Sequence, residues 1–203
     1  MQRVISYIDG FNLYFGLRAK GWRRFFWLDV QKLSVNLLKP QQQLVYTKYF
    51  TARVSEPVEK RKRQQTYLEA LETLSDFKIF YGKYQLNPRM CRKCGFQDSV
   101  PNEKMTDVNI AVELLADAFQ DRYDTALLIS ADSDLTGPVE TVRRLFPRKQ
   151  VIVMFPPKRS SVELKNVASA CFIIGHGNFK RSQFPEHVTK EDGYVLVRPT
   201  GWR

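Results

Sequence analysis

The feature that most constrains the fold of this chain is a regular alternation of short β-rich runs with helical patterns. We predict six strands, over residues 3–8, 44–51, 77–84, 125–130, 151–155 and 171–174. Helical patterns fill the intervals between them, over residues 11–19, 29–38, 57–74, 107–119, 138–145 and 162–168. This alternation predicts an α/β fold with a mostly parallel central sheet flanked by helices.

Residue chemistry along the chain supports a buried parallel sheet. Residues 126–129 and 151–155 are almost continuously apolar, as strands covered on both faces usually are. Ser55 precedes the third helical pattern, where we expect an N-cap, and Pro57 lies in its first turn.

Two segments break the alternation. Residues 85–104 contain Asn87-Pro88 and Pro101-Asn102 and are predicted to be an insert loop. After Gly175 the alternation ends, although residues 194–197 are typical of an edge strand. We therefore expect one domain over residues 1–177 and a C-terminal tail, residues 178–203, packed on it.

The charge and cysteine content bound the class of protein. Lys and Arg total 32 against 21 Asp and Glu, a formal net charge of +11, which suits a polyanionic partner but equally serves solubility. Three cysteines do not make a secreted disulfide framework. With no long apolar run and no N-terminal signal pattern, we expect a cytoplasmic protein without a membrane partner.

Acidic residues fall where predicted strands end. Asp9 ends the first strand, and Asp132 and Asp134 follow the fourth. Asp107 opens the helix leading into the fourth strand, on a stripe with Leu114 that should face the sheet. Because ligands of open parallel sheets bind at the carboxyl ends of the strands, we expect these four acids to converge.

Converging carboxylates repel one another unless a cation lies between them. A hard divalent ion with oxygen ligands, Mg²⁺ or Mn²⁺, meets that need and can assist phosphodiester hydrolysis. Asp9 and Asp134 could instead cap the helices that follow them, and Asp107 could complement a helix dipole.

Three ordered segments resemble the motifs of the NYN domain family, within the PIN-like nuclease superfamily. They are residues 7–14 (Tyr-Ile-Asp-Gly-Phe-Asn-Leu-Tyr), 104–108 (Lys-Met-Thr-Asp-Val) and 128–135 (Leu-Ile-Ser-Ala-Asp-Ser-Asp-Leu). The resemblance covers residues 3–175, and the tail is similar to that of bacterial members. It implies a PIN-like three-layer fold and metal-dependent endoribonuclease activity on RNA, single-stranded or structured.

The resemblance also implies roles for individual residues. The metal-binding and catalytic acids would be Asp9, Asp107, Asp132 and Asp134. Asn12 and Ser130 would support them and Lys104 would contact phosphate, although turn chemistry or solvation would also explain these three. From position alone, Lys158 and Arg159 are further phosphate candidates, because they follow the fifth strand.

The spacing Cys91-x-x-Cys94 is typical of half a zinc knuckle, and a structural zinc site needs four ligands. Cys171, His176 and His187 lie at no matching spacing, and Cys171 also suits the core. A zinc ion shared between two copies of the chain would complete the set, which would make the protein a homodimer.

Two further clusters of basic residues could bind a phosphate backbone, and the first of them is interleaved with aromatic residues. Phe25, Phe26 and Trp27 lie among arginines and could stack on single-stranded RNA or belong to the core. Residues 60–63 (Lys-Arg-Lys-Arg) could bind phosphate or form a solvated helix face.

Two functions compete with the ribonuclease. A non-catalytic RNA-binding or regulatory module could use the same fold. The spacing Asp132-x-Asp134-x-Thr136 also mimics the nucleophile motif of haloacid-dehalogenase-type phosphatases, but that motif normally ends the first strand and here follows the fourth.

Overall fold

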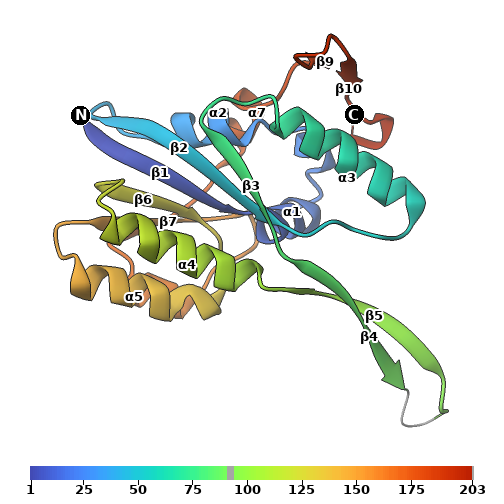
Figure 1. Ribbon diagram of the computed structural model, residues 1–203, viewed down its shortest axis with the longest axis horizontal. Coiled ribbons are helices and arrows are strands. Elements are labelled where there is room, and N and C mark those ends of the chain that lie inside the picture. Colours follow the sequence, from blue (N-terminus) through green and yellow to red (C-terminus); the bar gives the residue numbers. More distant parts are fainter. Residues whose placement is uncertain (91–93, 203) are drawn as a thin grey trace.

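The central element is a six-stranded sheet in a computed structural model that describes residues 1–90 and 94–202 (Figure 1). Its strands are β1 (Gln2–Asp9), β2 (Gln42–Thr51), β3 (Phe77–Tyr81), β6 (Thr125–Ile129), β7 (Gln150–Phe155) and β8 (Ala170–Ile173). Their order is β3-β2-β1-β6-β7-β8, and each neighbouring pair is parallel. The predicted α/β fold with a parallel central sheet is confirmed.

Helices cover both faces of this sheet and complete three layers (Figure 1). One face carries α1 (Gly10–Ala19), α2 (Val30–Asn36), α3 (Val58–Leu71), α7 (His176–Arg181) and the 3-10 turns η1 (Arg23–Phe25) and η3 (Thr200–Trp202). The other carries α4 (Thr106–Phe119), α5 (Thr136–Leu145), α6 (Val162–Val167) and the 3-10 turn η2 (Ser133–Leu135).

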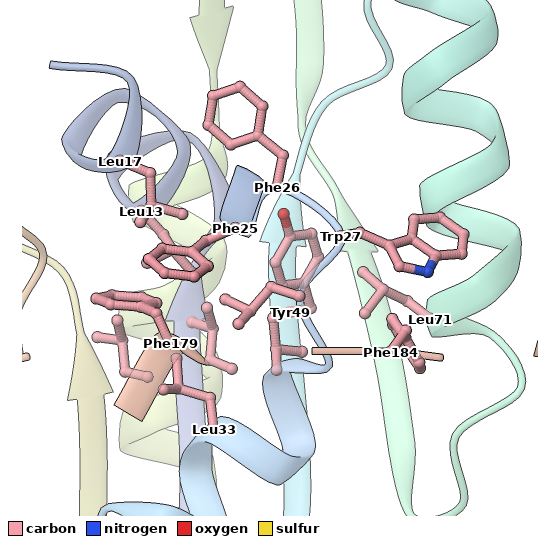
Figure 2. Packing of buried hydrophobic residues seen from close by; sticks show 14 of the residues in the cluster. Leu13, Leu17, Phe25, Phe26, Trp27, Leu33, Tyr49, Leu71, Phe179 and Phe184 are labelled. Carbon is pink, nitrogen blue, oxygen red and sulfur yellow. The ribbon is translucent and has the colours of Figure 1, made fainter. Parts of the chain in front are cut away.

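Two hydrophobic clusters hold the layers together. Alternate strand residues serve opposite faces, as the period of two requires: Val4 and Ile8 join the α1–α3 cluster, whereas Ile5 and Tyr7 join the α4–α6 cluster. Figure 2 shows the first cluster, where the rings of Phe25 and Phe179 lie stacked, with centroids 6.1 Å apart. Phe25, Phe26 and Trp27 are buried, as the core interpretation of this segment predicts.

The predicted insert loop is wrong, because most of it forms an antiparallel ribbon. Strands β4 (Lys83–Met90) and β5 (Gln97–Lys104) pair over their whole length and project away from the sheet (Figure 1). Pro88 and Pro101 misled the prediction, but a two-stranded ribbon has two free edges, where a missing N–H donor is tolerated.

The tail also differs from the prediction. Residues 195–197 form β10 (Val195–Val197), which pairs with β9 (His187–Thr189) in a sheet of their own and not at the edge of the main one. Helix α7 crosses the expected boundary after Gly177. Ser55 is not the N-cap of α3, because Pro57 occupies that position.

Helices α3 and α4 are the longest in residues 1–90 and 94–202, with 14 residues each. Among these residues, no helix combines the length and the apolar character that crossing a bilayer requires.

Candidate metal centre

The direction of strand addition reverses between β1 and β6. From β1 the chain adds β2 and β3 on one side, and β6 later starts the other half, β7 and β8. Such a reversal leaves a crevice at the carboxyl ends of the two central strands. Ile8 pairs in register with Ile129, so the residues that follow, Asp9 and Ser130, stand side by side at this crevice.

Asp9 is held in place by hydrogen bonds to both carboxylate oxygens. Its side chain is 4% exposed. Oδ1 accepts the backbone N–H of Asn12 at 2.9 Å, which caps α1, and Oδ2 accepts the hydroxyl of Ser130 at 2.9 Å. The capping interpretation is therefore correct for Asp9, and the cap fixes its carboxylate at the crevice.

Two further acids reach the same point. Asp107 lies in the first turn of α4 and is half-buried, while Asp132 follows β6. The backbone N–H of Asp132 donates to Ser130 Oγ at 3.1 Å, so one serine orients two of the acids. One carboxylate oxygen each from Asp9, Asp107 and Asp132 lie within 4.8 Å of one another.

The electrostatics of this carboxylate triad (Asp9, Asp107 and Asp132) are unfavourable without a cation. Burial raises the pKa of Asp9 to about 7, against the hydrogen bonds from Asn12 and Ser130, and the charges of Asp107 and Asp132 add to the rise. Burial, followed by the charges of Asp132 and Asp134, raises the pKa of Asp107 to about 6. Two like charges 4 Å apart repel by roughly 4 kcal/mol near a protein surface.

No lysine or arginine in the described residues forms an ion pair with the triad. Three carboxylates without a protein cation form the oxygen-rich donor set that a hard divalent ion prefers. The triad could therefore hold a metal ion.

Asp134, the fourth predicted acid, lies apart from the triad. Its side chain is exposed and is not among the three that converge, although its charge still acts on Asp107. It does not cap α5, because Leu135 is the N-cap residue. Asp132 takes the nearby capping role instead, since its Oδ1 accepts the N–H of Asp134 at 3.1 Å.

Asn12 connects the two halves of the crevice. It is 6% exposed, and its Oδ1 accepts the backbone N–H of Ala131 at 3.2 Å. Together with Ser130, it ties the start of α1 to the loop that carries Asp132. Their contacts position the acids.

The predicted phosphate contacts are accessible. Lys104 at the end of β5 and Lys158 after β7 are exposed, and Lys158 has a positive φ of 59°. The guanidinium of Arg159 lies over the ring of Phe15, 5.7 Å from its centroid. In the described residues, none of the three cations is paired with an acid.

The predicted zinc ligands are only partly described. Cys94 is exposed near the tip of the ribbon, and Cys91 lies outside the described residues. Cys171 is half-buried in β8, where a core role was expected. His176 packs against Trp22 and Phe25, with ring centroids 5.0 Å apart in each pair.

Sequence reasoning missed a second group of buried charges. Lys48 Nζ lies 2.5 Å from Asp117 and 2.6 Å from Glu113, and the Tyr7 hydroxyl donates to Asp117 at 2.5 Å. The available signal was Lys48 itself, a lysine in the second half of β2, where all the residues are buried.

It also missed a cavity of about 600 Å³ that is lined by residues of α1, η1, α3 and η3, among them Gly10, which follows Asp9 in the chain. The interleaved basic and aromatic residues of 18–27 and the basic residues 60–63 were its signal, but no pattern in the sequence joined the two segments.

Comparisons with known proteins agree with this architecture. The family model for the NYN domain matches residues 3–175. The chain is 28% identical to 6-hydroxy-3-succinoylpyridine 3-monooxygenase HspA of Pseudomonas putida, over 70% of this chain. The chain spans 55% of that relative's length. A Vibrio parahaemolyticus protein of unknown function superposes with a TM-score of 0.58 at 19% identity, over 90% of this chain and 96% of that one, which shows a shared fold.

Proposed function

The chain belongs to the NYN domain family, and from this premise we propose that it is a metal-dependent endoribonuclease. The observation that carries the proposal is the carboxylate triad, which gathers Asp9, Asp107 and Asp132 without a compensating lysine or arginine in the described residues. The PIN-like nuclease superfamily, in which this family is placed, supports hydrolysis of a phosphodiester.

In this proposal the triad holds one Mg²⁺ or Mn²⁺ ion. When bound, such an ion lowers the pKa of a water molecule and stabilises the charge that develops on a phosphodiester. Ser130 and Asn12 keep the carboxylates oriented through the hydrogen bonds described above. Lys104, Lys158 and Arg159 neutralise phosphates of the RNA strand, and the exposed Asp134 adds negative charge near Asp107.

The charge distribution supports a nucleic-acid substrate. The chain carries a formal net charge of +11, yet three of its acids gather at one point. Basic residues would hold the RNA backbone around the three carboxylates. Because carboxylates repel a phosphate, a cation must bind them before the phosphate can approach.

The name of the Pseudomonas relative suggests oxidation of a substituted pyridine as a second candidate activity. The cavity, with its aromatic walls and basic residues, is the observation that favours it. Incubation with 6-hydroxy-3-succinoylpyridine, oxygen and a reduced nicotinamide or flavin tests it, with substrate loss measured by chromatography.

The ribonuclease proposal is tested with labelled single-stranded and structured RNA, incubated with Mg²⁺, with Mn²⁺ or with a chelator. Asp132→Asn is compared with Glu140→Gln, an exposed acid of α5 that makes no ion pair in the described residues. We expect cleavage by the wild type and by Glu140→Gln, and a loss of at least about 100-fold in Asp132→Asn.

Other outcomes point to the competing functions. Cleavage that survives Asp132→Asn would contradict the proposed site. Tight RNA binding without cleavage under any metal would favour a non-catalytic module, and an aspartyl-phosphate trapped at Asp132 would favour a phosphatase.

A further inference from the structure

A large cavity lies on the face of the sheet that α1 and α3 cover. Its volume is about 600 Å³, within the usual range of ligand sites. Gly10 lines it, and the preceding residue is Asp9 of the triad. A Cβ at Gly10 would lie 2.5 Å from the Tyr49 hydroxyl, so glycine is required where the helix approaches this wall.

Aromatic rings form much of the cavity wall. Tyr49 and Phe26 lie deep in it, and Figure 2 shows the Tyr49 hydroxyl directed toward Phe26. Phe11 and Phe15 of α1 stack with centroids 6.1 Å apart, and Phe15 is 39% exposed. A flat ring entering from solvent would meet aromatic surface that the core does not cover.

The same cavity has four basic residues in its wall and one acid, Glu56. The cations are Arg18, Arg23, Lys60 and Arg63. Within residues 1–90 and 94–202, none of their side chains forms an ion pair with an acid. Cations gathered without partners around a cavity favour an anionic ligand.

The C-terminal tail closes one side of the cavity. The Trp202 ring packs 5.7 Å from that of Phe26 and 5.8 Å from that of Tyr67. The Arg198 guanidinium donates to the backbone oxygens of Arg24 and Trp202, which fastens the tail across η1. The wall therefore combines segments from both ends of the chain.

We propose that this cavity binds one nucleotide of the RNA strand, with its base among the aromatic rings and its phosphate on the basic residues. The proposal rests on the proposed function and adds a subsite to it. Base–aromatic stacking is sequence-tolerant and suits single-stranded RNA. Gly10 lines the cavity and Asp9 precedes it at the end of β1, so an RNA strand that passes this end of β1 could reach both the cavity and the triad.

The test measures binding in chelator, so that no cleavage occurs, for a single-stranded RNA and for an abasic ribose-phosphate oligomer of equal length. Phe15→Ala and Trp202→Ala should weaken RNA binding about fivefold or more and leave the abasic oligomer unaffected. Phe15→Ala also removes a contact with Arg159, whose guanidinium lies over the Phe15 ring, whereas Trp202 packs on Phe26. If both variants weaken RNA binding to a similar extent, the effect comes from the cavity and not from Arg159.

The double variant Arg18→Ala/Arg63→Ala should weaken both oligomers. The slope of log affinity against log salt should fall by roughly 0.7 for each lost phosphate contact. The matched control is Arg144→Ala/Arg148→Ala, which removes the same charge from two exposed positions, one in α5 and one between α5 and β7, on the side of the sheet that α4–α6 cover.

Two results with these variants would overturn the proposal. One is that Phe15→Ala and Trp202→Ala weaken binding of the RNA and of the abasic oligomer equally. The other is that the two arginine double variants weaken RNA binding equally. Tighter binding of a free heteroaromatic acid, such as nicotinic acid, than of a nucleoside monophosphate would overturn it as well. If Phe15→Ala discriminates between the oligomers but no metal supports cleavage, the subsite stands and only the proposed function fails. If cleavage occurs and neither ring variant changes RNA binding, only the subsite fails.

Discussion

Helix α4 places one acid against the sheet near each of its ends, and only one of these two acids has a cationic partner. Near its C-terminus, Asp117 is 1% exposed and accepts hydrogen bonds from Tyr7 and Lys48, both at 2.5 Å. Near its N-terminus, Asp107 meets Asp9 and Asp132, and no lysine or arginine of the described residues pairs with it.

The two acids differ in whether the protein itself compensates their charge. A buried carboxylate that has its own cation and hydrogen bonds is satisfied within the fold and needs no ligand. A buried group of carboxylates without a cation destabilises the metal-free protein, which makes sense if a ligand supplies the missing charge. The same helix thus carries one acid for the fold and one for the site.

The largest loss of stability expected from a substitution comes from removing the cation of the satisfied group. Lys48→Met leaves Glu113 without its cation and Asp117 with only the exposed Arg122 at 3.4 Å, so we expect a loss of about 3 kcal/mol in the free energy of unfolding. Chemical denaturation measures it. Lys78→Met, an exposed lysine on the neighbouring strand β3, is the matched control.

A double variant sharpens this result. Lys48→Met/Asp117→Asn should recover part of the lost stability, because no unpaired charge remains at Asp117. If Lys48→Met costs no more than Lys78→Met, the buried pair does not hold the fold as described.

The second effect is a pH dependence of the metal-free protein. The pKa of Asp9 is about 7 in the folded chain, against an ordinary value of 3.8. Between these values the folded state keeps a proton that the unfolded state has lost, so stability is complete below pH 3.8 and falls as pH rises toward 7. The difference amounts to about 4 kcal/mol, since one pKa unit is worth about 1.4 kcal/mol.

Denaturation in chelator at pH 4.5 and pH 7.5 measures this slope. Asp9→Asn should flatten it and should be more stable than the wild type at the higher pH. An equal slope in Asp9→Asn would assign the effect to other groups.

The third effect is stabilisation by metal. A divalent ion at about 100 times its Kd should raise the free energy of unfolding by about 2.7 kcal/mol, and by less at acidic pH, where protons compete for the carboxylates. Thermal melts with Mg²⁺ or Mn²⁺ measure it. Asp132→Asn should lose this response and Glu140→Gln should keep it; a full response in Asp132→Asn would locate the ion elsewhere.

The smallest expected effect comes from Ser130, whose hydrogen bonds orient two acids of the triad. Ser130→Ala removes a donor to Asp9 that lowers its pKa and an acceptor for the N–H of Asp132. We expect metal affinity and cleavage to fall about tenfold, the lower end for residues that support a ligand. Ser133→Ala, on the same loop but exposed, should leave both unchanged.

Much of the fold and of the triad was predictable because the signals were local. Apolar runs and helical patterns located the strands and helices of the main sheet within a few residues, and the carboxyl ends of the strands pointed to Asp9 and Asp132. The ribbon was not predictable in the same way, since Pro88 and Pro101 normally interrupt strands and their effect depends on which edges are paired.

The cavity and the Lys48–Asp117 pair were out of reach for a different reason. Trp202 belongs to a tail in which strands and helices do not alternate regularly. It lines the cavity only because it packs on Phe26 and Tyr67 in the folded protein. Lys48 lies on β2 and Asp117 on α4, and no local sequence pattern in either segment indicates that the two residues pair.

The sequence by itself determined the α/β alternation, the resemblance to the NYN family and the acids at the strand ends, because these depend on periodicity and on residue type. Only the tertiary structure decided that Asp134 stands apart from the triad, that Asp117 is neutralised and Asp107 is not, and that the C-terminal tail closes a cavity lined by Gly10. Charge balance and enclosure depend on distances between elements, which the chain sets only when the sheet, the helices and the tail pack together.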